Sequence, residues 1–298
     1  MKCAAPGGFR QTAVSMKENA QKTALITGST DGLGRAVASS LAAAGFKVLI
    51  HGRDAQRGGE LMRRISAKGG AAEFHRADFA SLAEVRALAN TVQDLHPRLQ
   101  LLINNAGIGT GDDGRPAPRR TSADGYELRF AVNYLAGYLL TRLLLPSLAR
   151  SAPARIVNVA SVGQYPLDFD NLMLERAYSG MRAYAQSKLA QVMMTLDLAA
   201  ELRDGGVTVN CLHPATYMDT TMVRAAGVAP ASTVAEGAAA VMHLAVSPEL
   251  EGQTGEYFDG LRRSRANAQA YDPQARRRLA EVSARLTGLD QHSGPGRA

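Results

Sequence analysis

The sequence contains no tryptophan and only two cysteines, Cys3 and Cys211, in 298 residues. Two cysteines so far apart form no disulfide framework, and the six histidines show no metal-ligand spacing with them. We therefore expect a protein of the reducing cytoplasm, with no structural metal.

A long apolar run is missing from residues 1–22, MKCAAPGGFRQTAVSMKENAQK. Signal peptides and membrane spans require such a run, so we expect no membrane association. This segment and residues 289–298, LDQHSGPGRA, are expected to be flexible. Residues 23–288 show no repeat or linker, and they are expected to form one domain.

The net charge is +7 and the isoelectric point is near 9.6, which would suit an acidic partner. However, residues 1–24 carry four Lys or Arg against one Glu, and residues 262–298 carry eight Arg against three acids. These two segments account for the whole surplus. Because solvated ends explain the charge, we expect no nucleic-acid partner.

Short apolar runs alternate with longer helical patterns along the middle of the chain. Runs such as LQLLIN and RIVNVA fit strands that are buried on both faces of a parallel sheet, with helices as the crossovers. This order predicts a single-domain, Rossmann-type α/β fold. Its doubly wound parallel sheet should have about seven strands, with helices on both faces and one long helix from about Asp124.

Three glycines stand where the first strand runs into the first helix, in TGSTDGLG. The N-terminus of a helix attracts phosphate, and glycine lets the backbone approach it closely. The same glycines would also serve as plain turn and packing residues, but their position directly after the first strand favours a nucleotide site. The expected contacts are Gly28, Ser29, Thr30, Asp31, Gly32, Leu33 and Gly34.

The second strand, KVLIHG, runs into Arg53. A domain that binds NAD usually places an acid here for the ribose hydroxyls, whereas a guanidinium suits the 2′-phosphate of NADP. Asp54 is the competing signal, but it precedes a helical run and fits a helix N-cap. The sequence therefore favours NADP, the alternative being that Arg53 is an exposed turn residue.

Tyr184 and Lys188 are four residues apart on an expected helix, so they share one face about one turn apart. A nearby ammonium is expected to lower the pKa of the Tyr184 phenol toward a useful acid or base. An isolated pair of this kind is often only a surface pair. Ser161 favours a catalytic pair over a surface pair, because it lies at the carboxyl end of a buried strand, where parallel sheets bind ligands.

Several motifs agree in their order with those of a known family. They are TGSTDGLG with the spacing G-x-x-x-G-x-G, NNAG at 104–107, Asn133 in FAVNYLAGYLLT, Ser161 closing RIVNVAS, YAQSK at 184–188 and HPATYMDTT at 213–221. Over about residues 22–261 the chain resembles the short-chain dehydrogenase/reductase family. The long connection between Ser161 and Tyr184, and YDPQARRRLAEVSARLTGL near the end, resemble its retinol-dehydrogenase-like branch.

The resemblance implies an oxidoreductase that transfers hydride between NADP(H) and a carbonyl or alcohol. Tyr184 would give or take the proton, Ser161 would hydrogen-bond the reacting oxygen, and Lys188 would perturb Tyr184 and bond the nicotinamide ribose. Asn133 would bend its helix and hold a water through its carbonyl, or it is a helix residue that bonds locally. Further implied cofactor contacts are Asp78, Asn105, Ala106, Gly107, Pro214 and Thr216, besides Tyr184 and Lys188.

The substrate is expected to be a fairly bulky apolar ketone, aldehyde or secondary alcohol. Its proposed pocket is formed by Phe169, Met173, Tyr217 and Met218, which could equally be plain cover for the sheet edge. Two other functions stay open: a catalytically idle NADP-sensing regulator, and an epimerase or dehydratase of the extended branch. The family also suggests a homodimer through the helices of Asn133 and Tyr184, unless the C-terminal segment covers that face.

Overall fold

A computed structural model describes residues 21–111 and 118–290 of the chain. The ends expected to be flexible, 1–22 and 289–298, lie almost wholly outside the described residues, as does Cys3. Within the described part, no helix combines the length and the apolar character that crossing a membrane requires.

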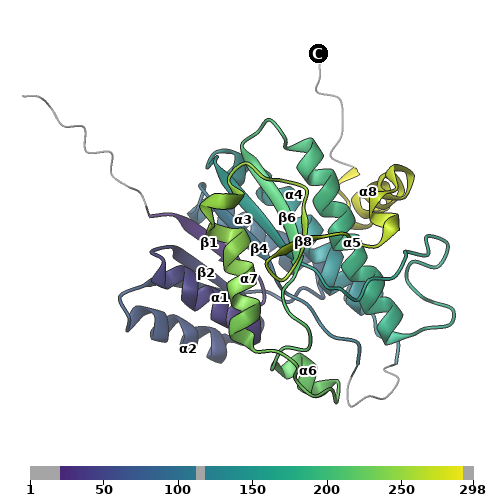
Figure 1. Ribbon diagram of the computed structural model, residues 1–298, viewed down its shortest axis with the longest axis horizontal. Coiled ribbons are helices and arrows are strands. Elements are labelled where there is room, and N and C mark those ends of the chain that lie inside the picture. The colour runs from purple at the N-terminus through teal and green to yellow at the C-terminus, as the bar shows by residue number, and fades with distance from the viewer. Residues whose placement is uncertain (1–20, 112–117, 291–298) are drawn as a thin grey trace, which may run out of the picture.

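A single eight-stranded sheet forms the centre of the molecule, in the order β3-β2-β1-β4-β5-β6-β7-β8 (Figure 1). Its strands are β1 (Thr23–Ile26), β2 (Lys47–Gly52), β3 (Ala71–Arg76), β4 (Leu101–Asn104), β5 (Ala154–Val159), β6 (Val207–His213), β7 (Tyr257–Asp259) and β8 (Arg262–Ser264). All neighbouring strands are parallel except β7 and β8. The single-domain, doubly wound α/β fold expected from the sequence is confirmed.

The expected number of about seven strands is short by one. The additional strand, β8, pairs antiparallel with β7 at the edge of the sheet. It consists of Arg262, Arg263 and Ser264, which are all exposed. Because an exposed edge strand buries neither face, it leaves no apolar run in the sequence by which it could be found.

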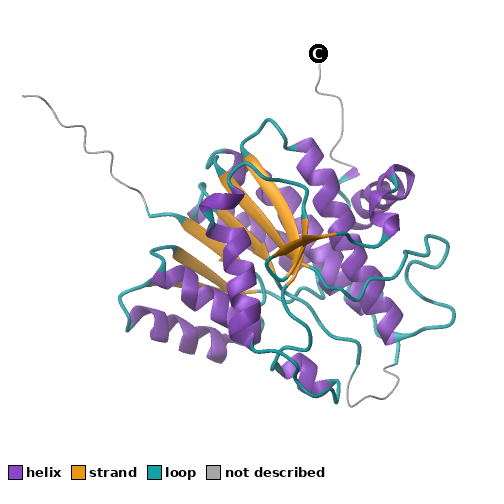
Figure 2. Cartoon of the chain, in the orientation of Figure 1, coloured by secondary structure: helices purple, strands orange, loops and turns teal. Residues whose placement is uncertain are grey.

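Helices cover both faces of the sheet, as Figure 2 shows. The helices are α1 (Gly32–Ala43), α2 (Ala55–Ser66), α3 (Leu82–Leu95), η1 (Phe130–Leu135), α4 (Ala136–Ala149), α5 (Gly180–Glu201), α6 (Thr221–Ala225), α7 (Val234–Val246), η2 (Pro248–Leu250), η3 (Ala268–Tyr271) and α8 (Pro273–Thr287). One apolar core joins α1, α2 and α7 to the sheet, and the other joins α3, α4, α5 and α8 to it. Continuous apolar strands are therefore buried on both sides, as the runs predicted.

The segment after β4 differs from the long helix expected from about Asp124. A turn comes first, and the helix begins with the π-helical segment η1 before continuing as α4. The Glu127 carboxylate accepts a hydrogen bond from Phe130 N at 2.7 Å, which satisfies a backbone donor at this start. The helix is therefore shorter than predicted and irregular at Asn133, which lies within η1.

The C-terminal helix α8 packs against α5 and η1. Arg276 forms an ion pair with Asp197 at 3.0 Å, and the Tyr134 hydroxyl is 2.7 Å from that of Ser283. α8 therefore covers part of the face through which a homodimer was expected to form. The homodimer stays a prediction.

Candidate active site

The turn between β1 and α1 can be built only with glycine at two positions. Gly28 has φ +64°, and a Cβ there would lie 2.8 Å from Cα of Ala106. A Cβ on Gly34 would lie 2.3 Å from the carbonyl oxygen of Gly28. The turn therefore brings its backbone against both the following helix and the loop after β4.

The loop after β4 holds this turn in place. The Asn105 side chain donates to the carbonyl oxygens of Thr27 and Gly28 at 2.9 and 3.0 Å. The backbone N–H groups of Asn105 and Ala106 both donate to Thr27 Oγ1. Asn105 and Ala106 thus pack the turn, and a direct contact of theirs with a cofactor stays a prediction.

His51, at the end of β2, was not among the residues predicted from the sequence. Its Nδ1 accepts a hydrogen bond from Gly28 N at 3.1 Å, so the ring proton is on Nε2, which lies 3.2 Å from the carbonyl oxygen of Ala77. Burial lowers the pKa of His51 to about 4, so the ring is neutral near pH 7. His51 therefore ties the glycine turn to the loop that carries Asp78.

Side chains of the predicted glycine loop divide into two groups. Ser29 is fully buried and accepts from His51 N, and Leu33 packs in the apolar core. Asp31 instead caps α1 by accepting from Gly32 N, and its other oxygen accepts from Thr221 Oγ1 at 2.8 Å. Burial by itself would raise the pKa of Asp31, but this hydrogen bond, the one from Gly32 N and nearby arginines outweigh it and lower the pKa.

A cavity of about 280 Å³ opens beside the glycine turn, between α1 and α2. It is lined by Thr30, Asp31, Arg35, Arg57, Glu60, Leu61, Arg64 and Thr221. Three of these side chains are arginines against two acids, so the cavity carries a positive balance that suits an anion. Sequence reasoning missed Arg35 and Arg57, although Arg35 directly follows Gly34.

Two predicted cofactor residues meet at the carboxyl ends of β2 and β3. A guanidinium nitrogen of Arg53 lies 3.8 Å from a carboxylate oxygen of Asp78, and the Arg53 side chain is exposed whereas that of Asp78 is partly buried. Asp54 accepts from Gln56 N and Arg57 N, which confirms it as the N-cap of α2. The competing acid is therefore engaged by the helix, whereas Arg53 is exposed and forms a long ion pair with Asp78.

Ser161 and Tyr184 meet beyond the carboxyl end of β5. Ser161 is buried, and its Oγ accepts from Gly163 N at 3.1 Å. It also forms a hydrogen bond with the Tyr184 phenol. Tyr184 is half-buried on the second turn of α5. The backbone carbonyl oxygen of Ser161 accepts hydrogen bonds from the Tyr257 hydroxyl and the Gln164 side-chain amide. The two hydroxyls predicted to share a reacting oxygen are thus side by side.

Lys188 lies one turn further along α5 and is buried, with 5% of its surface exposed. Its ammonium donates to the carbonyl oxygen of Val159 and to Gln191 Oε1, each at 2.9 Å. It is 5.8 Å from the centre of the Tyr184 ring. Gln191 was not predicted, although its spacing of three residues from Lys188 on the same helix could have indicated it.

The expected effect of Lys188 on Tyr184 is not what this structure shows. Burial raises the pKa of Tyr184, and only the hydrogen bond with Ser161 opposes it. Burial also lowers the pKa of Lys188 to about 7, because no carboxylate among the described residues lies beside the ammonium to offset its lost hydration. The loss of hydration on burial therefore affects the pKa of each group more than the other group's presence does. The spacing of two residues on a helix cannot reveal how deeply they are buried.

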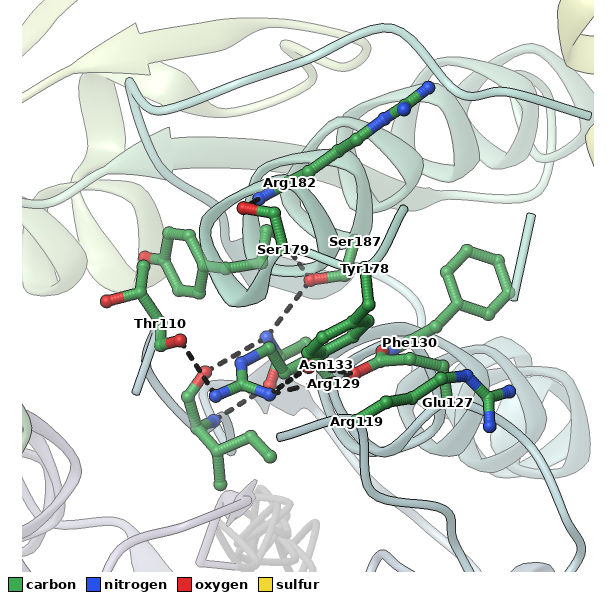
Figure 3. A network of polar contacts seen from close by, with 12 residues as sticks. Thr110, Arg119, Glu127, Arg129, Phe130, Asn133, Tyr178, Ser179, Arg182 and Ser187 are labelled. Atoms are coloured by element: carbon green, nitrogen blue, oxygen red, sulfur yellow. Dashed lines mark hydrogen bonds and ion pairs between the residues drawn. The ribbon is translucent and has the colours of Figure 1, made fainter. Parts of the chain in front are cut away.

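Asn133 connects the loop after β4 to α5. Its Oδ1 accepts from Ile108 N at 2.8 Å, and its Nδ2 donates to Ile108 O. The same Nδ2 also donates to Ser187 Oγ, as Figure 3 shows. A Cβ on Gly107 would lie 3.3 Å from Asn133 Oδ1 and 3.6 Å from Lys188 Nζ. The structure therefore brings Gly107, Asn133 and Lys188 together, and Asn133 itself lies in the irregular helical segment η1.

A buried ion pair beside Asn133 also escaped the sequence analysis. Glu127 is 0% exposed and lies 3.7 Å from the Arg129 guanidinium, while the Tyr178 hydroxyl bonds both side chains. Arg129 also donates to the carbonyl oxygens of Gly109 and Thr110, and Figure 3 shows it reaching between these segments. This network fastens the connection after Ser161 to the loop after β4.

The segment after β6 carries the last predicted cofactor residues. Pro214 is buried, and the Thr216 hydroxyl is exposed and lies 3.0 Å from His213 Nε2. The short helix α6 follows, and a Cβ on Gly109 would lie 2.9 Å from Met222. Since Thr221 in α6 also bonds Asp31, this segment spans from the glycine turn to the loop after β4.

The four predicted pocket residues are placed separately. Phe169 lies beneath Arg278 of α8 at 4.8 Å, and Met173 Sδ accepts from Glu127 N. Met218 packs against Gly237 of α7, on the other face of the sheet, and Tyr217 is 54% exposed. The structure therefore does not join these four into one wall, and Tyr217 is the member that stands open to a ligand.

A family model described as short chain dehydrogenase matches residues 22–230. Retinol dehydrogenase 13 of Mus musculus is 36% identical over 304 residues, which cover 93% of this chain and 87% of that protein. Polyprenol dehydrogenase of Mus musculus is 37% identical over 288 residues, which cover 90% of this chain and 84% of that protein.

Solved structures agree with these relatives. The Pseudomonas aeruginosa RhlG/NADP active-site complex has a TM-score of 0.65 and 30% identity, and the match covers 80% of this chain and 94% of that one. A short-chain dehydrogenase from Shigella flexneri complexed with NADP has a TM-score of 0.66 and 26% identity, with 81% of this chain and 97% of that one covered.

Proposed function

The chain belongs to the short-chain dehydrogenase family, in its retinol-dehydrogenase-like branch, and from that premise we propose an NADP(H)-dependent enzyme that acts on a bulky apolar carbonyl or alcohol. The family assignment makes it an alcohol or carbonyl oxidoreductase that uses a nicotinamide cofactor. The observation that carries the proposal is the hydrogen-bonded pair of Ser161 and Tyr184, with Lys188 buried one turn away. We place the enzyme in the reducing cytoplasm, in keeping with its buried free thiol, Cys211.

The residues at the glycine turn fit the cofactor. Gly28 and Gly34 form a cradle that a Cβ would fill, and the cavity beside it is rich in arginine. Arg53 would hold the 2′-phosphate, with Asp78 on the adenine. When bound, the cofactor supplies or accepts the hydride at its nicotinamide ring.

The chain's own groups then handle the proton. In reduction, Tyr184 donates its phenol proton to the carbonyl oxygen, and the Ser161 hydroxyl stabilises the negative charge that develops there. Lys188 lies against Gly107 and Asn133, where it would bond the ribose and receive a proton from solvent. The raised pKa of Tyr184 suits an acid that keeps its proton until it is needed.

The relatives support an apolar substrate, since two of them are named for retinol and polyprenol, both apolar alcohols. We propose that Tyr217 contacts the part of the substrate remote from the reacting carbon. Each substrate methylene that becomes buried would contribute about 0.8 kcal/mol, or roughly fourfold in efficiency. Small ketones would lack this contact and would be poorly positioned.

The proposed function is tested by NADPH consumption against ketones and aldehydes that range from acetone to polycyclic compounds. We expect kcat/KM to rise steeply with apolar size, and Tyr217→Ala to reduce the large-to-small ratio. Leu95→Ala, which removes another exposed apolar side chain, is the control and should leave that ratio unchanged. NADPH binding with no turnover of any compound would instead favour the regulatory protein.

The cofactor preference is tested by Arg53→Asp. The change removes a charge-assisted contact worth about 1.5 to 3 kcal/mol, so KM for NADPH should rise roughly tenfold to a hundredfold while KM for NADH changes much less. Arg63→Asp makes the same charge change on the exposed last turn of α2 and should alter neither constant. An unchanged ratio of the two Michaelis constants in Arg53→Asp would reject the phosphate role.

A further inference from the structure

Two ligand-type side chains lie on one face of the edge strand β3. Glu73 and His75 are two residues apart, so both point to the same side of the sheet. Glu73 is in register with Leu49, which belongs to the apolar core formed with α3, α4 and α5. The two side chains therefore face α3, whose C-cap residue is His96.

These three side chains converge on a small volume. His96 Nε2 lies 2.7 Å from Glu73 Oε2, and His75 Nε2 lies 3.7 Å from the same oxygen. One ligand atom from each residue can be chosen so that all lie within 4.8 Å of one another. The two imidazole rings are nearly perpendicular, with centroids 6.2 Å apart.

His75 has a polar atom that packing does not explain. Only 9% of its side chain is exposed, and its Nε2 is buried with no hydrogen-bond partner among the described residues. A buried nitrogen without a partner is costly.

We propose that Glu73, His75 and His96 form a binding site for Zn²⁺ or a similar first-row divalent cation. Two imidazole nitrogens and one carboxylate oxygen are a ligand set typical of zinc, with water completing four-coordination. Ligand bonds of about 2.0 to 2.2 Å need the hydrogen bond between Glu73 and His96 to open and the widest pair of ligand atoms to close by roughly 1 Å.

Lys47 defines the electrostatics of this site. Its ammonium lies 2.6 Å from Glu73 Oε1, so the other carboxylate oxygen, Oε2, is the one that faces the two histidines. It would orient the carboxylate, as groups around metal ligands do, while its charge opposes a bound cation. Glu73, His75 and His96 could not be recognised as a site from the sequence, because they meet only through the packing of α3 on β3.

The test is calorimetric titration of the full-length, tag-free protein with Zn²⁺, together with thermal unfolding. Wild type should bind one Zn²⁺ and gain in Tm, and Mg²⁺ should do neither. His75→Leu should weaken Zn²⁺ binding at least about tenfold. Because it removes a buried nitrogen that makes no hydrogen bond, it should fold without metal at least as stably as wild type.

Two further variants make the result specific. Lys47→Met removes the opposing charge and should tighten Zn²⁺ binding several-fold, whereas His243→Gln on α7 should bind as wild type does. Absence of Zn²⁺ binding to wild type, or equal binding to wild type and His75→Leu, would overturn the proposal. Neither Zn²⁺ binding nor thermal unfolding depends on turnover. A failure of the zinc proposal can therefore be told apart from a failure of the proposed oxidoreductase function.

Discussion

Tyr184→Phe is expected to bind NADPH nearly as wild type does and to lose about 10²- to 10⁴-fold of its turnover, the range that general acid catalysis provides. The substitution keeps the ring and its packing on α5 but removes the proton that the reacting oxygen would receive. It also removes the hydrogen bond with Ser161. We expect kcat to fall much more than the cofactor Kd rises, because the loss affects the transition state.

The matched control is Tyr138→Phe, which deletes another mostly buried phenol hydroxyl, on α4. Its turnover should stay close to that of wild type. The measurements are single-turnover rates with the best ketone and cofactor binding by fluorescence titration. If Tyr184→Phe keeps turnover within about threefold of wild type, the general-acid role must be abandoned.

Lys188→Met is expected to lose activity and to gain stability at the same time. Burial lowers the pKa of Lys188 from an ordinary 10.5 to about 7, so the folded chain holds this proton less tightly than the unfolded chain. A difference of this size corresponds to about 5 kcal/mol as an order of magnitude. Leaving Val159 O and Gln191 without a donor costs about 1 to 3 kcal/mol, so a net gain of about 2 to 4 kcal/mol is expected.

The pH dependence identifies the cause of that gain. Between about pH 7 and 10.5 the unfolded chain carries the Lys188 proton and the folded chain does not, so this group makes stability rise with pH. At pH 7 and below, its full penalty is present. Lys188→Met should therefore be most stabilising near pH 7 and lose its advantage toward pH 10.5.

Urea unfolding of both proteins across this range measures the difference. The buried tyrosines and Cys211 are present in both proteins, so their contribution to the pH dependence of stability cancels in the comparison. Lys68→Met, at an exposed position after α2, is the control and should leave the free energy of unfolding unchanged across this range. A Lys188→Met protein that is less stable than wild type at pH 7 would show that the hydrogen bonds of Lys188 outweigh its desolvation.

Local patterns in the sequence determined most of the fold and the order of the motifs. Apolar runs buried on both faces require a parallel sheet with helical crossovers, and the glycines of TGSTDGLG mark a turn where a Cβ would collide with backbone. Asp54 could be predicted as an N-cap because capping depends on residues within one turn. The edge strand β8 could not, because it buries nothing.

Only the tertiary structure decided the electrostatics of the site. Whether Lys188 keeps its charge depends on how deeply β5, α5 and the loop after β4 bury it, and the spacing to Tyr184 contains none of that information. The ion pair of Glu127 and Arg129, and the meeting of His75 with His96, likewise join segments far apart in the chain. A sequence specifies its hydrophobic periodicity locally, whereas burial and the pairing of charges are sums over every element packed around a group.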